Sequence, residues 1–453
     1  MMRRVFVTGL SVVGAFGDDL EAFWTDCQAS RSVVEPIPER WFDFADYRST
    51  IWSPVSIPAW PELFSRVERI QHDAVTLLAV AAVQSALNHA GFETVVADKK
   101  SNTRDVPKLD QDRCAAFIGT GVGGTNSLMA SHAHQVLSGS QRRLSELLNR
   151  IDDESVREDL SAVLGRMTHD KRFNPFVVSM LMPNAPASYV GIKFGLRGGS
   201  TSCNYACASG TVAIGSAFDA VRNGHIDTAI AGGAEYLDDP HGSIFLGFDS
   251  CGALVRDCQV PDSANRPFDA ARSGFLFSQG GAGMLVLESE EHLDARNGEP
   301  IAEILASGTS FDAFSMMNPH PQGAAIESML SEMLNSAHLR AEDVSYINAH
   351  GTGTQANDAC EAAMIARVFG STVAVNSTKS LLGHSMGASG AIEAVVTALS
   401  LRDQRLHPNR NLDAPIEALN FVTEATSQSI RVAISQSFAF GGHNAAVLMS
   451  RTD

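Results

Sequence analysis

The chain has 453 residues, of which 44% are hydrophobic and 19% charged, and its formal net charge is −17. This composition is typical of a compact globular protein with two or three domain-sized cores. The negative charge argues against nucleic acid and anionic membrane as partners, because both need a basic surface. No apolar run reaches the ~18 residues of a membrane span, and the basic N-terminus breaks at Thr8-Gly9, unlike a secretory signal.

The cysteines indicate a reducing compartment. There are seven of them, irregularly spaced, and no two form a C-x-x-C pair. Neither a structural zinc site nor a disulfide framework is expected from that pattern. We therefore expect a cytoplasmic protein without a bound metal.

Short β-rich runs alternate with helix-like segments along the chain. The runs cover residues 5–8, 115–119, 228–231, 282–287, 346–348, 373–376 and 445–448, and the first long helix-like segment covers 74–90. This alternation predicts a layered α/β architecture with a mixed or mostly parallel sheet.

Two polar segments have the character of insertions. Residues 98–113 are charged and lack apolar periodicity, which predicts a surface loop. Residues 138–172 are charged with helical spacing, which predicts a solvated helix rather than a lid or a dimer flap. A turn-like stretch at 294–300 separates two halves, which we place at 1–295 and 296–453.

An internal repeat is visible in two helix-like segments. Ala208-Ser209-Gly210 opens one segment and Ala388-Ser389-Gly390 opens the other, and both are rich in small residues. Small residues around a helix predict close packing on several sides. The pair indicates a duplicated half-domain in which Cys207 corresponds to Gly387.

Two other motifs are misleading. Residues 119–124 fit G-x-G-x-x-G after a strand, but no acidic residue follows at the expected distance of about 20 residues, so a tight turn is favoured over a dinucleotide site. His132 and His134 alternate on a predicted helix and do not share a face, which argues against a metal site.

Cys207 is the strongest candidate for a nucleophile. It lies just ahead of the small residues that open a helix, where backbone N–H groups and the helix dipole favour an anion and lower a thiol pKa. The alternative is a small buried hydrophobe. His350 and His384, each on a glycine turn far downstream, favour the nucleophile because a cysteine with distant histidines is a catalytic pattern.

Residues 438–444 form a second glycine-rich turn, in which Gly441 and Gly442 follow Phe440. Paired glycines let backbone N–H groups face a ligand, the geometry of an oxyanion hole, although a plain turn fits the same residues.

Together these residues resemble the elongating β-ketoacyl-acyl-carrier-protein synthases of the thiolase superfamily. The resemblance spans nearly the whole chain and is specific in its order and spacing. The matching stretches are residues 4–9, 117–124, 195–198, 204–210, 265–269, 348–354, 377–384 and 437–444.

The resemblance implies a five-layer αβαβα fold built from two similar halves. It also implies a two-step reaction in which Cys207 takes an acyl group from an acyl carrier protein. Malonyl-carrier protein then loses CO2, and its enolate attacks the acyl group to give a 3-oxoacyl product two carbons longer. No metal or redox cofactor is implied, because the substrates arrive on the phosphopantetheine arm of the carrier.

The same resemblance implies residue roles. His350 and His384 donate hydrogen bonds from neutral imidazole, and Lys379 helps to keep them neutral. The remaining roles are an oxyanion donor and gate at Phe440 beside Gly441 and Gly442, supporting positions at Glu393, Thr352, Thr354 and Asp358, and an acyl pocket at Phe248.

Several positions depart from the family pattern. Gln279 stands where a carboxylate is usual, in a loop one residue longer than in relatives. Gly199 replaces a proline, and Tyr205 replaces a threonine two residues before the cysteine. A ring at Tyr205 would narrow the pocket or alter a dimer contact.

Few basic residues occupy the positions at which relatives bind the carrier protein. Val67, Ile70, Gln71 and Gly252 stand where relatives place basic residues. The remaining candidates for carrier docking are Arg66, Arg69, Lys171 and Arg172.

The sequence therefore predicts a decarboxylating β-ketoacyl synthase that elongates fatty acids and forms a homodimer. One alternative is a type II polyketide or polyene ketosynthase, paired as a heterodimer with a ketosynthase-like chain-length subunit. A second is a non-catalytic chain-length subunit, which Cys207 disfavours. A third is a non-decarboxylating thiolase, which Cys360 does not support because it lies outside any matching motif.

Overall fold

The computed structural model describes residues 2–57, 60, 62–167, 173–256, 258 and 260–452. An 11-stranded sheet runs through the molecule in the order β14-β12-β11-β16-β17-β10-β1-β9-β8-β6-β7. Its strands, in chain order, are β1 (Val5–Val13), β6 (Cys114–Gly119), β7 (Gly199–Cys203), β8 (Thr228–Tyr236), β9 (Gly280–Ser289), β10 (Ala302–Phe311), β11 (Tyr346–Asn348), β12 (Ala374–Asn376), β14 (Asn420–Phe421), β16 (Val432–Ala439) and β17 (His443–Arg451).

The two halves of this sheet repeat one pattern. In the first half β6 is parallel to β7 and β8, and β8 is antiparallel to β9, which pairs with β1. In the second half β11 is parallel to β12 and β16, and β16 is antiparallel to β17, which pairs with β10. The antiparallel pair β1–β10 joins the halves. The predicted construction from two similar halves is thus confirmed.

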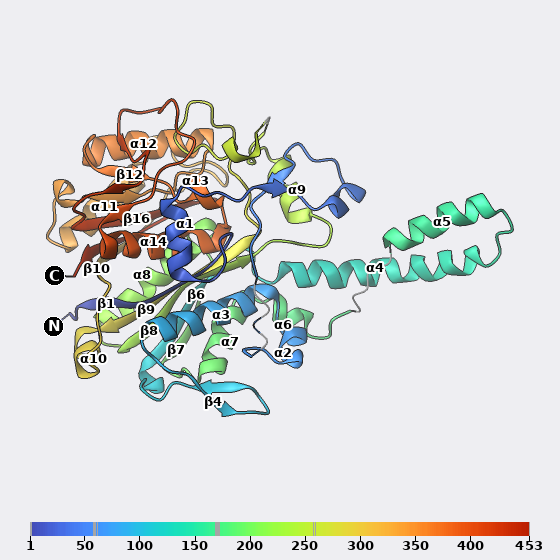
Figure 1. Ribbon diagram of the computed structural model, residues 1–453, viewed down its shortest axis with the longest axis horizontal. Helices are drawn as coiled ribbons and strands as arrows, with labels where there is room; N and C mark the ends of the chain where they lie inside the picture. The colour runs from blue at the N-terminus through green and yellow to red at the C-terminus, as the bar shows by residue number, and fades with distance from the viewer. Residues whose placement is uncertain are drawn as a thin grey trace.

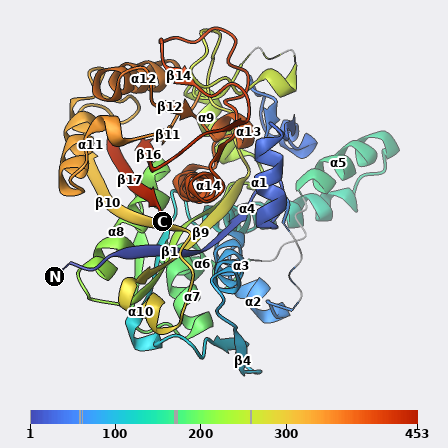
Figure 2. The ribbon, with the colours of Figure 1, turned by 60° about the vertical axis from the view of Figure 1, so that its left-hand side comes forward.

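The two halves of the sheet form two layers, one on each side of a pair of central helices. Helices form the other three layers (Figures 1 and 2). The central helices α8 and α14 each contact strands of both halves, α3 and α7 cover the first half, and α11 and α12 cover the second. This is the predicted five-layer αβαβα arrangement. The bounds are α3 (Ala74–His89), α7 (Ala185–Phe194), α8 (Ser209–Arg222), α11 (Ala324–Ser336), α12 (Gln355–Phe369) and α14 (Ser389–Asp403).

The shorter elements lie at the periphery or in connections. They are α1 (Leu20–Gln28), β2 (Glu35–Pro36), β3 (Ile51–Trp52), α2 (Arg66–Gln71), α6 (Val177–Leu181), α9 (Ser243–Ser250), α10 (Glu290–Ala295), α13 (Lys379–Leu382), β13 (Arg405–Leu406), β15 (Thr426–Ser427) and the 3-10 helices η1 (Glu39–Asp43), η2 (Gln111–Arg113), η3 (Ala206–Ala208), η4 (Pro261–Ser263), η5 (Ala341–Asp343) and η6 (Met386–Ala388).

Small residues allow the two central helices to touch. A Cβ at Gly210 would lie 2.8 Å from the backbone nitrogen of Ala391, and one at Gly390 would lie 2.1 Å from Oγ1 of Thr211. Every residue of α14 from Ser389 to Leu401 is buried. A helix that is covered on all sides needs no polar stripe, and residues 389–401 of α14 have none, whereas α8 exposes Asp219 near its C-terminal end.

The local repeat is also present. Short 3-10 helices, η3 and η6, precede α8 and α14. Ala206 and Met386 open them with φ angles of 48° and 47°, a left-handed conformation that is uncommon outside glycine. Cys207 therefore stands at a strained turn whose counterpart carries Gly387.

The insertions differ from one another. The predicted loop at 98–113 is in part wrong, because it contributes to a two-stranded sheet of β4 (Val95–Asp98) and β5 (Thr103–Asp105) and to η2. The carboxylate of Asp98 accepts the N–H of Lys100 at 2.9 Å and so stabilises the connecting turn. The second insertion, 138–172, is helical as predicted over most of its described part: α4 (Thr125–Leu148) and α5 (Glu154–Met167) form a hairpin that projects from the body (Figure 1), and residues 168–172 lie outside the described residues.

Among the described residues, the structure contains no helix long and apolar enough to cross a lipid bilayer.

Candidate active site

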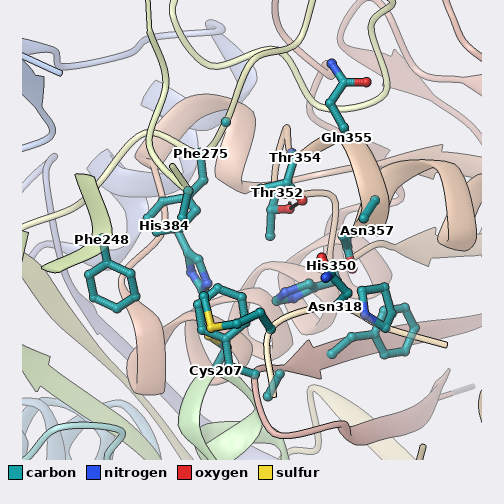
Figure 3. Close-up of a pocket in the computed structure, with 18 of the residues that line it drawn as sticks. Cys207, Phe248, Phe275, Asn318, His350, Thr352, Thr354, Gln355, Asn357 and His384 are labelled. Atoms are coloured by element: carbon teal, nitrogen blue, oxygen red, sulfur yellow. Dashed lines mark hydrogen bonds between the residues drawn. The ribbon is translucent and has the colours of Figure 1, made fainter. Parts of the chain in front are cut away.

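A cavity of about 410 Å³ opens where the two halves meet, and three of the four predicted catalytic side chains line it, while Lys379 lies behind His350 (Figure 3). Cys207 lies in η3 before α8, His350 follows β11, and His384 precedes η6 and α14. Phe248, Thr352, Thr354 and Phe440 also line the cavity. Residues far apart in sequence thus converge on one enclosed space.

Cys207 is 7% exposed, and its sulfur lies 3.1 Å from Nε2 of His384. Burial raises the pKa of the Cys207 thiol to about 12, while the charge of Lys379 and the backbone N–H groups of Phe440 and Cys207 act against that rise. The expected lowered pKa, and with it a resting anion, is therefore wrong. Enclosure in an apolar pocket outweighs the helix terminus, so the thiol needs a base in order to react.

His384 is placed to be that base. Its pKa lies well below the usual value, because burial and the nearby charge of Lys379 both disfavour imidazolium. Nδ1 lies 2.9 Å from Oγ of Ser389, and the ring of Phe275 packs edge-on at 5.2 Å. A neutral imidazole with a fixed orientation therefore faces the sulfur.

His350 is held by Lys379. The Lys379 ammonium lies 3.2 Å from Nδ1 of His350, 2.7 Å from its carbonyl oxygen and 2.5 Å from Oε1 of Glu393. Burial, followed by the charges of Lys379 and His384, places the pKa of His350 well below the usual value. An ammonium can only donate, so Nδ1 accepts and the ring proton resides on Nε2.

Two carboxylates fix the turn that carries His350. Glu361 accepts the N–H groups of His350 and Gly351, both at 2.7 Å. Asp358, a predicted supporting residue, accepts the N–H of Thr352 at 3.0 Å. Thr352 and Thr354 face the cavity with their hydroxyl oxygens 2.9 Å apart.

Glu235 is a site residue that sequence reasoning missed. It is fully buried and accepts the N–H groups of Gly121 at 2.7 Å and Gly123 at 3.2 Å, within the glycine-rich loop 119–124. It also accepts the N–H of Gly387 at 3.1 Å. The loop's donors thus bind the protein's own carboxylate rather than a phosphate, and a charged residue at the end of a glycine-rich strand was the available signal.

The backbone N–H groups in the turn around Phe440 have different partners. Gly441 donates to the carbonyl of Met316 at 2.9 Å and Gly442 to that of Ala439 at 3.0 Å, so both N–H groups are used internally. Their φ angles of 90° and 83° shape the turn. This leaves the N–H of Phe440 to interact with the sulfur, together with that of Cys207.

Two residues that depart from the family pattern, Gln279 and Tyr205, lie in different environments. Gln279 is buried and accepts the N–H of Val55 at 2.8 Å while donating to Asp238 at 3.2 Å. Tyr205 does not line the cavity; it is 38% exposed and packs edge-on against His443 at 5.1 Å. Narrowing of the pocket by this ring is therefore wrong.

Two of the predicted docking residues, Arg66 and Arg69, lie apart from the cavity. Arg66 and Arg69 are exposed on α2 and do not line it. Lys171 and Arg172 lie outside the described residues. In the part of the chain that the structure describes, no group of three or more histidine, cysteine, aspartate or glutamate side chains could hold a metal ion.

A five-layer thiolase-like fold with a cysteine and two neutral histidines around one cavity defines a condensing acyltransferase. Residues 2–292 match the family model for the N-terminal domain of β-ketoacyl synthases, and residues 301–413 match the model for the C-terminal domain. The chain belongs to the β-ketoacyl synthase family.

Individual relatives agree with this assignment. The chain is 32% identical to 3-oxoacyl-[acyl-carrier-protein] synthase 2 of Coxiella burnetii, over 99% of each chain. Two solved structures cover 100% of both chains: a type II polyketide ketosynthase in complex with its acyl-carrier protein (25% identity, TM-score 0.81) and the ishigamide ketosynthase/chain length factor (27% identity, TM-score 0.80).

Proposed function

We propose that this enzyme elongates an acyl group by two carbons in fatty acid synthesis, using acyl- and malonyl-acyl-carrier protein. The observation that carries the proposal is the placement of the Cys207 sulfur 3.1 Å from His384 Nε2 inside a cavity also lined by His350. Acyl transfer requires a thiol and a base, and decarboxylation requires the two imidazole donors.

In the first step Cys207 attacks the acyl thioester and His384 Nε2 takes the thiol proton. The N–H groups of Cys207 and Phe440 stabilise the tetrahedral oxyanion, each donor being worth roughly 2.7–4 kcal/mol. Collapse of the intermediate breaks the bond to the carrier's sulfur, which receives the proton from His384. The products are acyl-Cys207 and a free phosphopantetheine thiol.

In the second step malonyl-carrier protein loses CO2, and the electron pair of the broken bond forms an enolate. His350 and His384 donate from Nε2–H to the enolate oxygen, and burial together with the charge of Lys379 keeps both imidazoles neutral. The enolate carbon attacks the acyl carbon and expels Cys207 as a thiolate. Uptake of one proton, relayed by His384, restores the thiol.

We add proposals on the partner, the oligomeric state and the location of the enzyme. We propose acyl carrier protein as partner, docking through Arg66 and Arg69 with Lys171 and Arg172. We also propose a homodimer, a division of the chain at residue 295, no added cofactor and a cytoplasmic location. The seven cysteines are free, which supports a reducing compartment. Charge reversal at Arg66 and Arg69 should raise the KM for the carrier without changing kcat, and an unchanged KM would refute docking there.

A ketosynthase of a type II polyketide or polyene pathway is the second candidate. It is favoured by similarity to a ketosynthase/chain length factor structure over the whole chain. Such an enzyme would act as a heterodimer and be inactive or insoluble alone. A non-catalytic chain-length subunit is disfavoured by Cys207.

The test is condensation by the purified protein alone. With acyl- and malonyl-carrier proteins, mass spectrometry should detect the 3-oxoacyl product two carbons longer. Cys207→Gln should abolish condensation and retain malonyl decarboxylation, because the histidines remain. Inactivity alone with activity restored by a ketosynthase-like partner would favour the second candidate, and condensation by Cys207→Gln would refute the nucleophile.

A further inference from the structure

Both ring nitrogens of His384 are engaged, but only one faces the substrate cavity. Nε2 lies 3.1 Å from the Cys207 sulfur, and Nδ1 lies 2.9 Å from the hydroxyl oxygen of Ser389. Ser389 is 3% exposed, and its oxygen also accepts the N–H of Ser385 at 3.0 Å and lies 3.1 Å from the Ser385 hydroxyl. The imidazole is thus hydrogen-bonded to the first of two buried hydroxyl groups that contact each other.

Counting donors and acceptors shows that this pair has two arrangements, and both keep the hydrogen bond between Ser389 and Nδ1. A hydroxyl has one donor and two acceptor sites, and the Ser385 N–H fills one acceptor site of Ser389. In one arrangement Ser385 donates to Ser389, Ser389 donates to Nδ1, and the ring proton is on Nε2. In the other, Nδ1–H donates to Ser389 and Ser389 donates to Ser385, which leaves Nε2 as an acceptor. No heavy atom has to move between them.

The two chemical steps need different forms of His384. Acyl transfer needs Nε2 as an acceptor for the thiol proton, and decarboxylation needs Nε2–H as a donor to the enolate oxygen. His350 has no such freedom, because the Lys379 ammonium at 3.2 Å can only donate to its Nδ1. Of the two histidines that line the cavity, His384 is therefore the one whose Nδ1 has a partner that can either give or take a hydrogen bond.

The first half of the protein provides an internal comparison. Ser209 is the repeat counterpart of Ser389, and it likewise accepts a backbone N–H, that of Tyr205 at 2.8 Å. Its hydroxyl donates toward the carbonyls of Ala206 at 2.7 Å and Thr120 at 3.2 Å. Carbonyls only accept, so the direction of the Ser209 hydroxyl is fixed. The reversible arrangement is confined to the half that carries His384.

We propose that Ser389, supported by Ser385, is a positioning residue that lets His384 exchange its two neutral forms between the acyl-transfer and condensation steps. The proposal rests on the proposed function, since it assumes that His384 acts in both steps. Removing the Ser389 hydroxyl leaves Nδ1 without its acceptor. The form with the proton on Nε2 is then favoured, because a buried Nδ1–H without an acceptor carries the full desolvation cost of that group.

The experiment compares the two half-reactions in Ser389→Ala and Ser385→Ala, with Ser400→Ala as control. Ser400 is a buried serine of the same helix, and its hydroxyl donates to the carbonyl of Val396 at 2.9 Å. Acyl loading of Cys207 is followed by intact mass with the acyl-carrier protein that loads wild type fastest. Decarboxylation of malonyl-carrier protein is measured in the same variants built on Cys207→Gln.

Loss of base catalysis in Ser389→Ala should slow acyl loading by roughly 10- to 100-fold, while decarboxylation changes by less than about 3-fold. Ser385→Ala should lower the ratio of the acyl-loading rate to the decarboxylation rate by less than Ser389→Ala does, and Ser400→Ala should leave this ratio unchanged. An equal fall in the rates of both half-reactions, or no fall in either rate, would overturn the proposed exchange of neutral forms by His384. Absence of both half-reactions in the unsubstituted proteins would instead overturn the proposed function.

Discussion

The ammonium of Lys379 lies 3.2 Å from Nδ1 of His350 and 2.5 Å from a carboxylate oxygen of Glu393. Burial raises the pKa of Glu393 to about 7, and the charge of Lys379 acts against that rise. The lysine therefore serves two purposes, as the partner of a buried carboxyl and as the group that keeps the proton of His350 on Nε2.

Replacing Lys379 by methionine should lower the rate of malonyl decarboxylation by roughly 10²–10³-fold, the usual loss for one oxyanion donor, because His350 is no longer held as a donor. The rate is measured in the Cys207→Gln background. Lys193→Met is the matched control, since Lys193 is also buried and lies 2.6 Å from Glu68. Both variants should be less stable, and an equal loss of decarboxylation in both would contradict the assigned role.

Decarboxylation should be nearly independent of pH from 8 down to about 6. The pKa values of His350 and His384 lie well below 6.5, chiefly because both are buried, so neither imidazole gains a proton in that range. The rate of Cys207→Gln is measured across the range in constant ionic strength. A midpoint near 6.5 would show that the imidazoles titrate normally and would contradict this account.

The same shifts have a consequence for stability. Below pH 6.5 the unfolded chain binds protons on these histidines that the folded protein cannot bind. Their contribution to the free energy of unfolding is present above the unfolded pKa and is lost as the pH falls. Glu393, whose pKa is raised to about 7, contributes in the opposite direction over the same range, so the histidine contribution is measured as a difference between variants. In urea unfolding at pH 7 and pH 5.5, the change in the free energy of unfolding should be more unfavourable in wild type than in His350→Gln.

Glu235→Ala should lower the free energy of unfolding by at least ~3 kcal/mol, because several buried N–H groups lose their acceptor at ~1–3 kcal/mol each. These donors include Gly121 in one half and Gly387 in the other. Glu235→Gln keeps an acceptor oxygen and should lose less than half as much. Urea unfolding measures both, and wild-type stability of Glu235→Ala would show that the N–H groups find other partners.

Phe248→Ala should extend the range of acyl groups that load onto the enzyme. The ring lines the cavity and lies 6.3 Å from that of Phe440, so its removal enlarges the space beyond the sulfur. Each further methylene that fits adds roughly 0.8 kcal/mol. Competition between acyl-carrier proteins of increasing length measures the shift. Phe245→Leu, a change behind the cavity wall, should leave the preference unaltered, and a preference unchanged in Phe248→Ala would remove that residue from the pocket.

The sequence predicts the architecture well where local patterns reflect packing. Small residues on all sides of 209–222 and 389–403 anticipate two buried central helices, and the repeated Ala-Ser-Gly anticipates their equivalence. The polar segment 98–113 is harder to predict, because its four-residue turn and short strand have no apolar periodicity.

The site is predicted less completely than the fold. Motifs identify Cys207, His350 and His384, but the pKa of the thiol depends on how deeply the sulfur is enclosed, which no local pattern reports. Glu235 likewise acts across the two halves, on Gly121 and Gly387. Such contacts arise only when distant segments pack together.

The most direct test is intact-mass measurement after mixing the enzyme with acyl-carrier proteins of several chain lengths. The account predicts that wild type gains the mass of one acyl group, that Cys207→Ala gains none, and that His384→Ala gains it far more slowly. Acylation of Cys207→Ala at the wild-type rate would contradict the claim that this buried thiol, activated by the neighbouring imidazole, is the acceptor.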